Sequence, residues 1–233
     1  MSDARFVVAV TGLAFEARIA AGTGVRTVAG GGDPAGLAAA LERELARGAT
    51  EIIRFGISGG LAVEASAGSW LVADAVVTRT ARWPVDAAWA AALRRQLPGA
   101  ILGSVAGADG IIASPAEKRA LGLTTGAFAV DMESHTVAAF AAKHDVPFAV
   151  FRVIADPLTR ALAPATFDGM RSDGTVNQRA VLGSLLRAPG QLPLLMRNAI
   201  DTRTALRALS RGRRLLGPGL GYPDFRQLLV DVA

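Results

Sequence analysis

Short apolar runs, each closed by Gly, Asp or Pro, recur along the first two thirds of the chain. Runs of this length, rich in Val, Ile and Phe, are typical of buried β-strands. Seven segments fit the pattern: residues 5–11, 25–29, 50–57, 70–78, 101–106, 127–132 and 147–155. Between them, Asp33 and Pro34 open a helical stretch that Gly48 closes, and a second helix is predicted from about Glu133 to His144. Strands that alternate with helices predict an α/β sheet covered on both sides.

The pattern changes after residue 157. Residues 158–175 are rich in Pro, Gly and Asp and predict a loop. Two helices are predicted after it, over residues 177–187 and roughly 191–211. The second can place six apolar side chains on one face: Leu192, Leu195, Met196, Ala199, Leu206 and Leu209. We therefore divide the chain into an α/β domain over residues 1–186 and a helical C-terminal extension over residues 187–233.

The positive charge belongs to that extension. Residues 1–186 contain 17 Lys or Arg and 17 Asp or Glu, whereas residues 187–233 contain eight Arg and three Asp. The whole net charge of +5 therefore lies after residue 186. A basic, partly apolar stretch can contact nucleic acid, an anionic membrane surface or an acidic partner.

The composition excludes several kinds of protein. With no cysteine, the chain can have no disulfide, no Cys-ligated zinc and no cysteine nucleophile. His135 and His144, nine residues apart on one predicted helix, do not share a face, so we expect packing or surface roles for them. No apolar run has the length of a membrane-spanning helix. We expect a cytoplasmic, metal-free protein.

Three segments at the ends of predicted strands can carry chemistry, because open α/β sheets bind ligands there. Gly56-Ile57-Ser58-Gly59-Gly60 lets backbone amides approach an anion or a sugar. In Asp131-Met132-Glu133, a carboxylate can hold two ribose hydroxyls while the methionine packs on the sugar. Asp156 precedes a proline, which favours an extended backbone at the sheet edge. The alternatives are a tight turn, a helix-start acid beside a core methionine, and a loop-capping acid.

The order of these segments resembles that in the nucleoside phosphorylase and nucleosidase superfamily. The stretch TGLAFEA, from Thr11 to Ala17, is also similar to the family's first strand and loop. The resemblance covers about residues 5–157 and implies a three-layer α/β fold with a mixed twisted sheet flanked by helices. The runs RVIADPLTRALAPA and LLRAPGQLPLL further resemble the hopanoid-associated branch of the family, thought to act on adenosylhopane.

The resemblance implies a role for each matching residue. Asp156 matches the acid that hydrogen-bonds or protonates N7 of the purine, which requires a raised pKa near neutral pH. Glu133 matches the residue that binds the ribose 2′ and 3′ hydroxyls, and Met132 the residue beneath the sugar. The other substrate-binding candidates are Ser58 and Gly59 of the glycine-rich segment, and Ile111 and Ile112 beside the base, where the family often has an aromatic residue.

Two features bear on the choice of nucleophile, and they match different members of the family. Arg54, with Gly12 nearby, matches the phosphate site of related phosphorylases, and a guanidinium suits a phosphate oxyanion. Glu16, in contrast, lies close to where hydrolytic nucleosidases place the catalytic glutamate that activates water. Ile57 occupies a position where both subfamilies commonly carry a hydroxyl. We favour phosphate and keep water as the alternative; a structural ion pair from Arg54 to Glu51 or Glu64 is a further possibility.

Together these features predict an enzyme that cleaves the N-glycosidic bond of an adenine nucleoside, adenosylhopane first, by phosphorolysis that releases adenine. A hydrolytic nucleosidase for methylthioadenosine or adenosylhomocysteine, and a non-catalytic nucleoside-binding protein, are the alternatives. We expect no metal and no organic cofactor, with inorganic phosphate as co-substrate. We expect no nucleic-acid partner, since the basic stretch lacks interleaved aromatics. The family implies a homo-oligomer, and residues 187–216 are a candidate contact with an anionic membrane.

Overall fold

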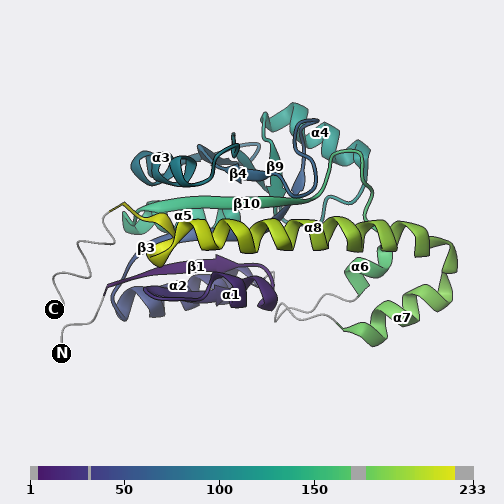
Figure 1. Cartoon of the computed structure of the whole chain (residues 1–233), viewed down its shortest axis with the longest axis horizontal. Coiled ribbons are helices and arrows are strands. Elements are labelled where there is room, and N and C mark those ends of the chain that lie inside the picture. The colour runs from purple at the N-terminus through teal and green to yellow at the C-terminus, as the bar shows by residue number, and fades with distance from the viewer. Residues whose placement is uncertain (1–4, 31–32, 169–176, 224–233) are drawn as a thin grey trace.

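The computed structural model describes residues 5–30, 33–168 and 177–223 of the chain (Figure 1). The strands are β1 (Phe6–Thr11), β2 (Val25–Ala29), β3 (Ala49–Gly60), β4 (Trp70–Val72), β5 (Ala75–Val77), β6 (Arg82–Pro84), β7 (Ile101–Leu102), β8 (Val105–Gly107), β9 (Ala129–Asp131) and β10 (Phe148–Asp156). The α-helices are α1 (Ala14–Ala20), α2 (Pro34–Ala46), α3 (Ala87–Gln96), α4 (Pro115–Thr125), α5 (Ser134–His144), α6 (Pro164–Asp168), α7 (Gln178–Arg187) and α8 (Leu192–Leu216). The short 3-10 helices η1 (Pro189–Gln191) and η2 (Pro218–Gly221) flank α8.

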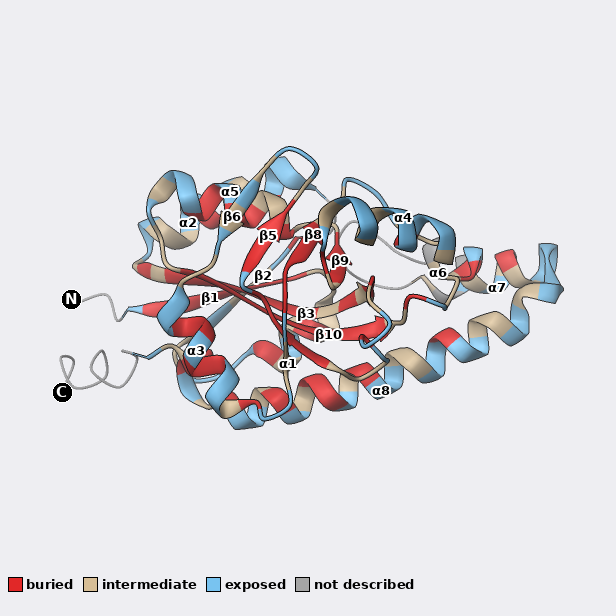
Figure 2. Cartoon of the chain, turned by 90° about the horizontal axis from the view of Figure 1, so that it is seen from above, coloured by how far each residue is buried: buried red, intermediate tan, exposed pale blue. Residues whose placement is uncertain are grey.

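The strands form one mixed sheet around the long strand β3. β3 pairs in parallel with β1 and β10, whereas its last two residues pair antiparallel with β9. β2 extends the sheet beyond β1, and β4 to β8 extend it beyond β9 and β10. The sheet curls into a half-barrel with helices on both sides (Figure 2). The predicted fold class is therefore confirmed.

Alternation along the strands divides the apolar side chains between two faces. Val7 and Ala9 of β1 belong to a buried cluster that includes side chains of α3 and α8, while Val8 and Val10 belong to a second cluster with α2 and α5. Successive side chains of a strand point to opposite faces, which explains the division. The result is a helix–sheet–helix arrangement of three layers.

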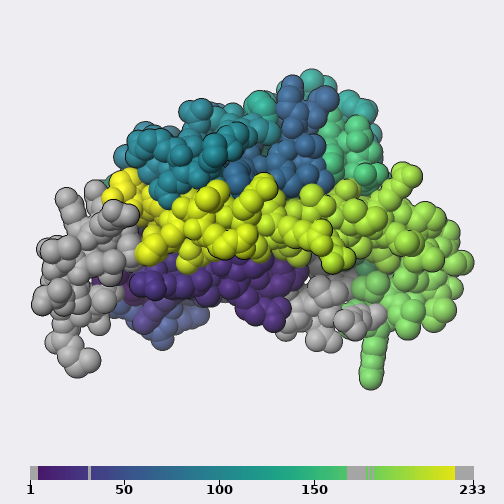
Figure 3. Space-filling model, in the orientation of Figure 1, coloured from purple at the N-terminus to yellow at the C-terminus, as the bar shows by residue number. Residues whose placement is uncertain are grey.

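Helix α8 lies along one face of the sheet (Figure 3). Its Ala205 and Leu209 are buried in the same cluster as Phe151 of β10. The indole Nε1 of Trp70 donates a hydrogen bond to Ala208 O at 2.9 Å. Residues after 187 thus share a hydrophobic core with the strands that precede them.

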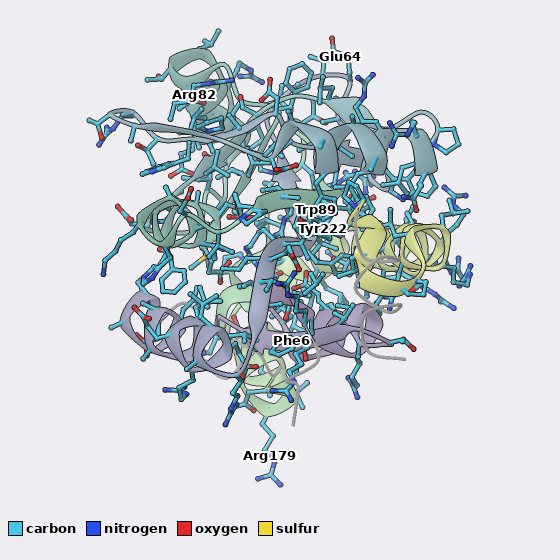
Figure 4. All side chains as sticks on the ribbon, turned by 90° about the vertical axis from the view of Figure 1, so that its left-hand side faces the viewer. Phe6, Glu64, Arg82, Trp89, Arg179 and Tyr222 are labelled. Carbon is cyan, nitrogen blue, oxygen red and sulfur yellow. The ribbon has the colours of Figure 1, made fainter. Side chains whose placement is uncertain are left out.

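The chain that follows α8 is also attached to this core. The indole Nε1 of Trp89 in α3 donates to Leu220 O at 3.1 Å. The ring of Tyr222 packs edge-on against Trp89, with 5.1 Å between the ring centroids (Figure 4). Leu220 itself is fully buried.

The predicted elements agree with the structure except at several places. The helices expected after Asp33 and from about Glu133 are confirmed as α2 and α5. The strand predicted over 70–78 is interrupted, because β4 pairs with β10 while β5 pairs with β8, and the strand predicted over 101–106 is divided in the same way. The segment 56–60 is not a turn, because β3 continues through Gly60 and pairs with β9. Helices α1, α3 and α4 were not predicted. The predicted loop over 158–175 contains α6, and its residues 169–175 lie outside the described part.

Candidate active site

A cavity of about 520 Å³ lies at the carboxyl ends of β3 and β10. Parallel strands end at the same edge of a sheet, so side chains that are distant in sequence meet there. The ten site residues proposed from the sequence all line this cavity: Gly12, Glu16, Arg54, Ser58, Gly59, Ile111, Ile112, Met132, Glu133 and Asp156. The structure thus brings the proposed residues together, while their individual roles stay predictions.

Glu16 places its carboxylate among backbone amides. It lies in the first turn of α1 and is 1% exposed. Its Oε2 accepts hydrogen bonds from the N–H groups of Gly12 and Leu13 at 2.8 and 2.9 Å, and its Oε1 accepts one from Ile57 at 2.7 Å. Gly56 permits this approach, because a Cβ at that position would lie 2.5 Å from Oε1. The protein's own carboxylate therefore occupies a set of amides of the kind that binds anions.

Arg54 lies next to Glu16 in a buried network of charges. Its Nη2 forms an ion pair with Glu133, its Nε lies 3.7 Å from Asp131 Oδ2, and its Nη1 donates to Val10 O at 2.9 Å. Burial alone would lower the pKa of Arg54, but the carboxylates of Glu133, Asp131 and Glu16 raise that pKa above its ordinary value. Arg54 is therefore a permanent cation within this buried network.

These partners differ from the two that the sequence suggested for Arg54. Glu51 lies three residues before Arg54 on β3, so its side chain points to the opposite face of the sheet. Glu64 is exposed at the outer surface of the molecule (Figure 4). The actual partners come from β9 and the start of α5, which meet β3 only in the folded chain.

Asp131 connects the network to helix α5. Its Oδ1 accepts the N–H groups of Glu133 and Ser134 at 3.1 and 2.8 Å, and its Oδ2 accepts the Ser134 hydroxyl at 2.6 Å. Burial raises the pKa of a carboxyl, yet the guanidinium groups of Arg152 and Arg54 hold the pKa of Asp131 below its usual value. Asp131 thus fixes the backbone at Glu133, whose side chain faces the cavity.

Arg152 of β10 adds a second buried cation. Its Nε lies 3.2 Å from Asp131 Oδ2, and its Nη2 donates to Ile57 O. Its Nη1 is buried and has no hydrogen-bond partner within the described residues. Burial, together with the nearby Arg54, lowers the pKa of Arg152 in spite of Asp131. An unpaired N–H on a cavity-lining guanidinium can bind an oxygen atom of a ligand.

Asp156 ends β10 and pairs with a buried lysine. Lys118 of α4 has no exposed surface, and its Nζ lies 2.5 Å from Asp156 Oδ2. The same ammonium donates to the carbonyl oxygens of Asp156, Pro157 and Arg160 at 3.1, 3.1 and 2.8 Å. Burial raises the pKa of Asp156; Lys118 opposes this effect and Asp201 adds to it, so the pKa stays above its usual value. A largely buried carboxyl of this kind is suited to proton transfer.

The lining contributed by α6, α7, α8 and the loop before them is mostly apolar. It consists of Leu162, Ala165, Thr166, Val181, Leu195, Asn198, Ala199 and Thr202. Asn198 fixes this wall, because its Oδ1 accepts the N–H of Ala163 at 2.9 Å and its Nδ2 donates to Ala161 O at 3.0 Å. The cavity therefore combines a charged part at the sheet edge with an apolar part at the C-terminal helices.

Other polar residues considered from the sequence lie elsewhere. The Nε of Arg160 donates to Asp201 Oδ2 at 2.7 Å, which ties the loop after β10 to α8. His135 pairs with Asp109 at 3.3 Å, and His144 stacks on Phe140. Among the described residues no group of three or more His, Asp or Glu is arranged to hold a metal ion.

The structure adds Lys118, Asp131 and Arg152 to the site. The Ser114-Pro115-Ala116-Glu117 sequence is a capping box that could have predicted the helix carrying Lys118. Burial of that lysine, however, depends on the path of the loop after β10, which no local pattern specifies.

Comparisons with known proteins agree with this architecture. A family model described as the phosphorylase superfamily matches residues 8–187. The chain is similar to the 5′-methylthioadenosine/S-adenosylhomocysteine nucleosidase of Helicobacter pylori, with 16% identity and a TM-score of 0.62 over 79% of this chain and 99% of that chain. Futalosine hydrolase of Helicobacter pylori gives 18% identity and a TM-score of 0.59, covering 79% of this chain and 98% of the hydrolase.

A third solved structure is the methylthioadenosine/S-adenosylhomocysteine nucleosidase of Streptococcus pneumoniae in complex with 8-aminoadenine. Its identity is 19% and its TM-score 0.60, over 78% of this chain and 99% of that chain. No curated protein matches the sequence. Similarity at these identities shows a shared fold.

Proposed function

The chain belongs to the phosphorylase superfamily, and on this basis we propose that it cleaves the N-glycosidic bond of an adenine nucleoside. The convergence of Asp156, Glu133 and Glu16 on one cavity carries the proposal. The reaction needs a proton for the purine, a hold on the ribose and a nucleophile at C1′. The similarity to a nucleosidase solved with 8-aminoadenine supports adenine as the base.

Asp156 donates its proton to N7 of the purine while the C1′–N9 bond breaks. The electrons of that bond pass to the purine, which leaves as neutral adenine. The raised pKa of Asp156 increases the fraction of this carboxyl that holds a proton at a given pH, as a general acid requires. Lys118 stabilises the carboxylate that remains after the transfer.

Glu133 accepts hydrogen bonds from the 2′ and 3′ hydroxyls of the ribose, and Met132 packs on the sugar. Glu16, Asp131 and Glu133 outnumber Arg54 and Arg152 by one charge at this end of the cavity. A negative surplus stabilises the positive charge that develops on the sugar ring in the transition state. This part of the site therefore favours bond cleavage by either nucleophile.

Water is the nucleophile that the geometry supports best. The amides of Gly12, Leu13 and Ile57, which are suited to bind a phosphate, already donate to Glu16. A phosphate dianion would also increase the negative surplus. In hydrolysis, Glu16 accepts a proton from water while the water oxygen bonds to C1′. Hydrolysis thus becomes the preferred form of the reaction, in place of the phosphorolysis favoured from the sequence.

Phosphorolysis is the second candidate because of Arg152. Arg152 lines the cavity, its buried Nη1 has no hydrogen-bond partner in the described part of the chain, and Arg54 contacts the same carboxylate oxygen of Asp131. Two adjacent guanidinium groups suit a phosphate oxygen. This form requires Glu16 to release the three amides before phosphate binds.

The apolar lining supports a substrate with an apolar group on its 5′ carbon. Val181, Leu195 and Ala199 offer surface for such a group and no charge to pair with a polar one. Adenosylhopane fits this description and is our preferred substrate. Methylthioadenosine and adenosylhomocysteine are the smaller alternatives.

The test measures adenine released from each of these three nucleosides, with and without inorganic phosphate. We expect release from adenosylhopane at a rate that phosphate does not change. A requirement for phosphate, with formation of a sugar phosphate, would establish the second candidate instead. Nucleoside binding without any release would contradict the enzymatic proposal and leave a nucleoside-binding protein.

A further inference from the structure

Helix α7 and the first half of α8 carry a row of exposed apolar side chains. Its five members are between 47% and 77% exposed: Leu182, Leu186, Leu192, Met196 and Ile200. Spacings of four residues place the members from each helix on one face of that helix. Single exposed apolar residues are ordinary, whereas a row across two consecutive helices is typical of a contact surface.

Toward the C-terminal end of α8, arginines occupy the same face of the helix as the apolar row. Arg203, Arg207, Arg211 and Arg214 are all exposed and follow Ile200 at helical spacing. Residues 178–216 contain eight arginines and a single acidic residue, Asp201, which pairs with Arg160. We call the apolar row and these four arginines the α7–α8 surface.

The molecule leaves this surface accessible. Figure 3 shows α8 uncovered along one face of the molecule, with α7 projecting at its end. Arg179 of α7 extends away from the body of the protein (Figure 4). None of the described helices is both long and apolar enough to cross a membrane, so a contact made here would be lateral.

The α7–α8 surface also adjoins the cavity. Leu195 and Ala199 line the cavity, and each immediately precedes a member of the apolar row, Met196 or Ile200. Consecutive residues of a helix are about 100° apart, so the cavity wall and the exposed row occupy neighbouring faces of α8. A partner on this surface would lie beside the cavity wall.

We propose that the α7–α8 surface docks on an anionic lipid bilayer, with the apolar row among the headgroups and the arginines on the lipid phosphates. An uncompensated positive charge beside an apolar row complements a surface that is negative outside and apolar beneath. A second copy of the chain fits less well, because a symmetric contact would bring two arginine rows together. The docking does not depend on the proposed reaction, since binding to a bilayer needs no turnover.

Flotation of the full chain with lipid vesicles tests the proposal. We expect binding to vesicles of phosphatidylcholine with about one third phosphatidylglycerol, weaker binding at high salt, and little binding to pure phosphatidylcholine. The R203Q/R207Q/R214Q variant should lose about 100-fold in affinity, at about tenfold or less for each arginine. The L192S/M196S/I200S variant should lose at least about tenfold, because its apolar row no longer inserts.

Two matched variants serve as controls. L123S replaces an exposed leucine on α4, and R94Q/R95Q removes two exposed arginines on α3. Both should bind anionic vesicles as the original chain does. Equal binding by all variants, or no binding to anionic vesicles, would overturn the proposal. The same conclusion would follow from a dimer in light scattering that L192S/M196S/I200S abolishes without any vesicle binding, because the surface would then be an interface between copies.

Discussion

The two parts of the cavity lining are held in place by different forces. At the sheet edge, charged side chains have fixed partners: Glu16 binds three amides, Arg54 pairs with Glu133, and Asp156 pairs with Lys118. At the C-terminal helices, the lining consists mostly of apolar side chains such as Leu195 and Ala199. Directional contacts therefore position one part, and packing positions the other.

Because of this difference, the two parts of the lining are suited to different tasks. A buried ion pair tolerates little displacement, so the charged part is suited to chemistry that every substrate shares. Apolar contacts discriminate by size and shape, so the helical part is suited to choosing among substrates. Substitutions in the charged part should change turnover or folding for all nucleosides, whereas substitutions in the helical part should change their ranking.

Asp156→Asn should have the largest effect on turnover. Asparagine keeps the shape of the side chain but has no proton to transfer to N7, so we expect kcat to fall by about 1,000-fold. Nucleoside affinity, measured by calorimetry, should change by less than about threefold. Asp74→Asn is the matched control, since Asp74 forms an exposed ion pair with Arg82 and does not line the cavity. Equal loss in both variants would show that Asp156 has no special part in catalysis.

Arg54→Met should have the largest effect on stability. It leaves Asp131 and Glu133 buried with less compensating charge, which costs about 3 to 5 kcal/mol. Urea unfolding measures this change as a lower free energy of unfolding. Arg26→Met removes the exposed ion pair to Glu44 and should cost less than about 1 kcal/mol. Similar values for the two variants would contradict the distinction between fixed and exposed charges.

Lys118→Met should shift the pH dependence of turnover. Lys118 opposes the effect of burial, so its removal raises the pKa of Asp156 further. The protonated acid then persists to higher pH, and the alkaline decline of kcat/KM should move upward in pH. Arg119→Met changes the exposed neighbour on α4 and should leave the profile unchanged. A profile that moves to lower pH would refute this arrangement of charges.

The Lys118→Met substitution should also change how the stability of the protein depends on pH. A carboxyl whose pKa is higher in the folded state than in the unfolded state binds its proton more tightly when folded. Its contribution to stability is therefore complete below the unfolded pKa and decreases as the pH rises through the folded value. Thermal unfolding should show a steeper loss of stability on raising the pH in this variant than in Arg119→Met.

Ala199→Phe should have a smaller and selective effect. A phenyl group fills part of the apolar lining, so KM should rise about tenfold for nucleosides with bulky 5′ groups. For methylthioadenosine, KM should change by less than about threefold. Ala91→Phe, at an exposed position of α3, is the control. A uniform change for all nucleosides would remove the proposed difference between the two parts.

The sequence predicted the strands of the sheet and the position of the site. It did not predict which strands pair with one another or which side chains contact each other in the folded chain. Short apolar runs identify buried strands, and strand ends such as Asp156 then mark the ligand-binding edge. The interruption between β4 and β5 was missed because it depends on which strands they join across the sheet. The partners of Arg54 were missed for a similar reason, since Glu133 lies 79 residues further along the chain. Lys118 shows the same limit, because only the folded loop at 156–160 provides its carbonyl partners.

Helix α8 sets a condition for any attempt to graft a new specificity onto this scaffold. One side of its first half lines the cavity up to Thr202, while one side of its second half, from Ala205, packs in the core against the strands. A chimera that exchanges the entire helix would also exchange part of the protein's interior. A chimera that changes only the cavity lining should therefore join the two sequences within α8, between Thr202 and Ala205.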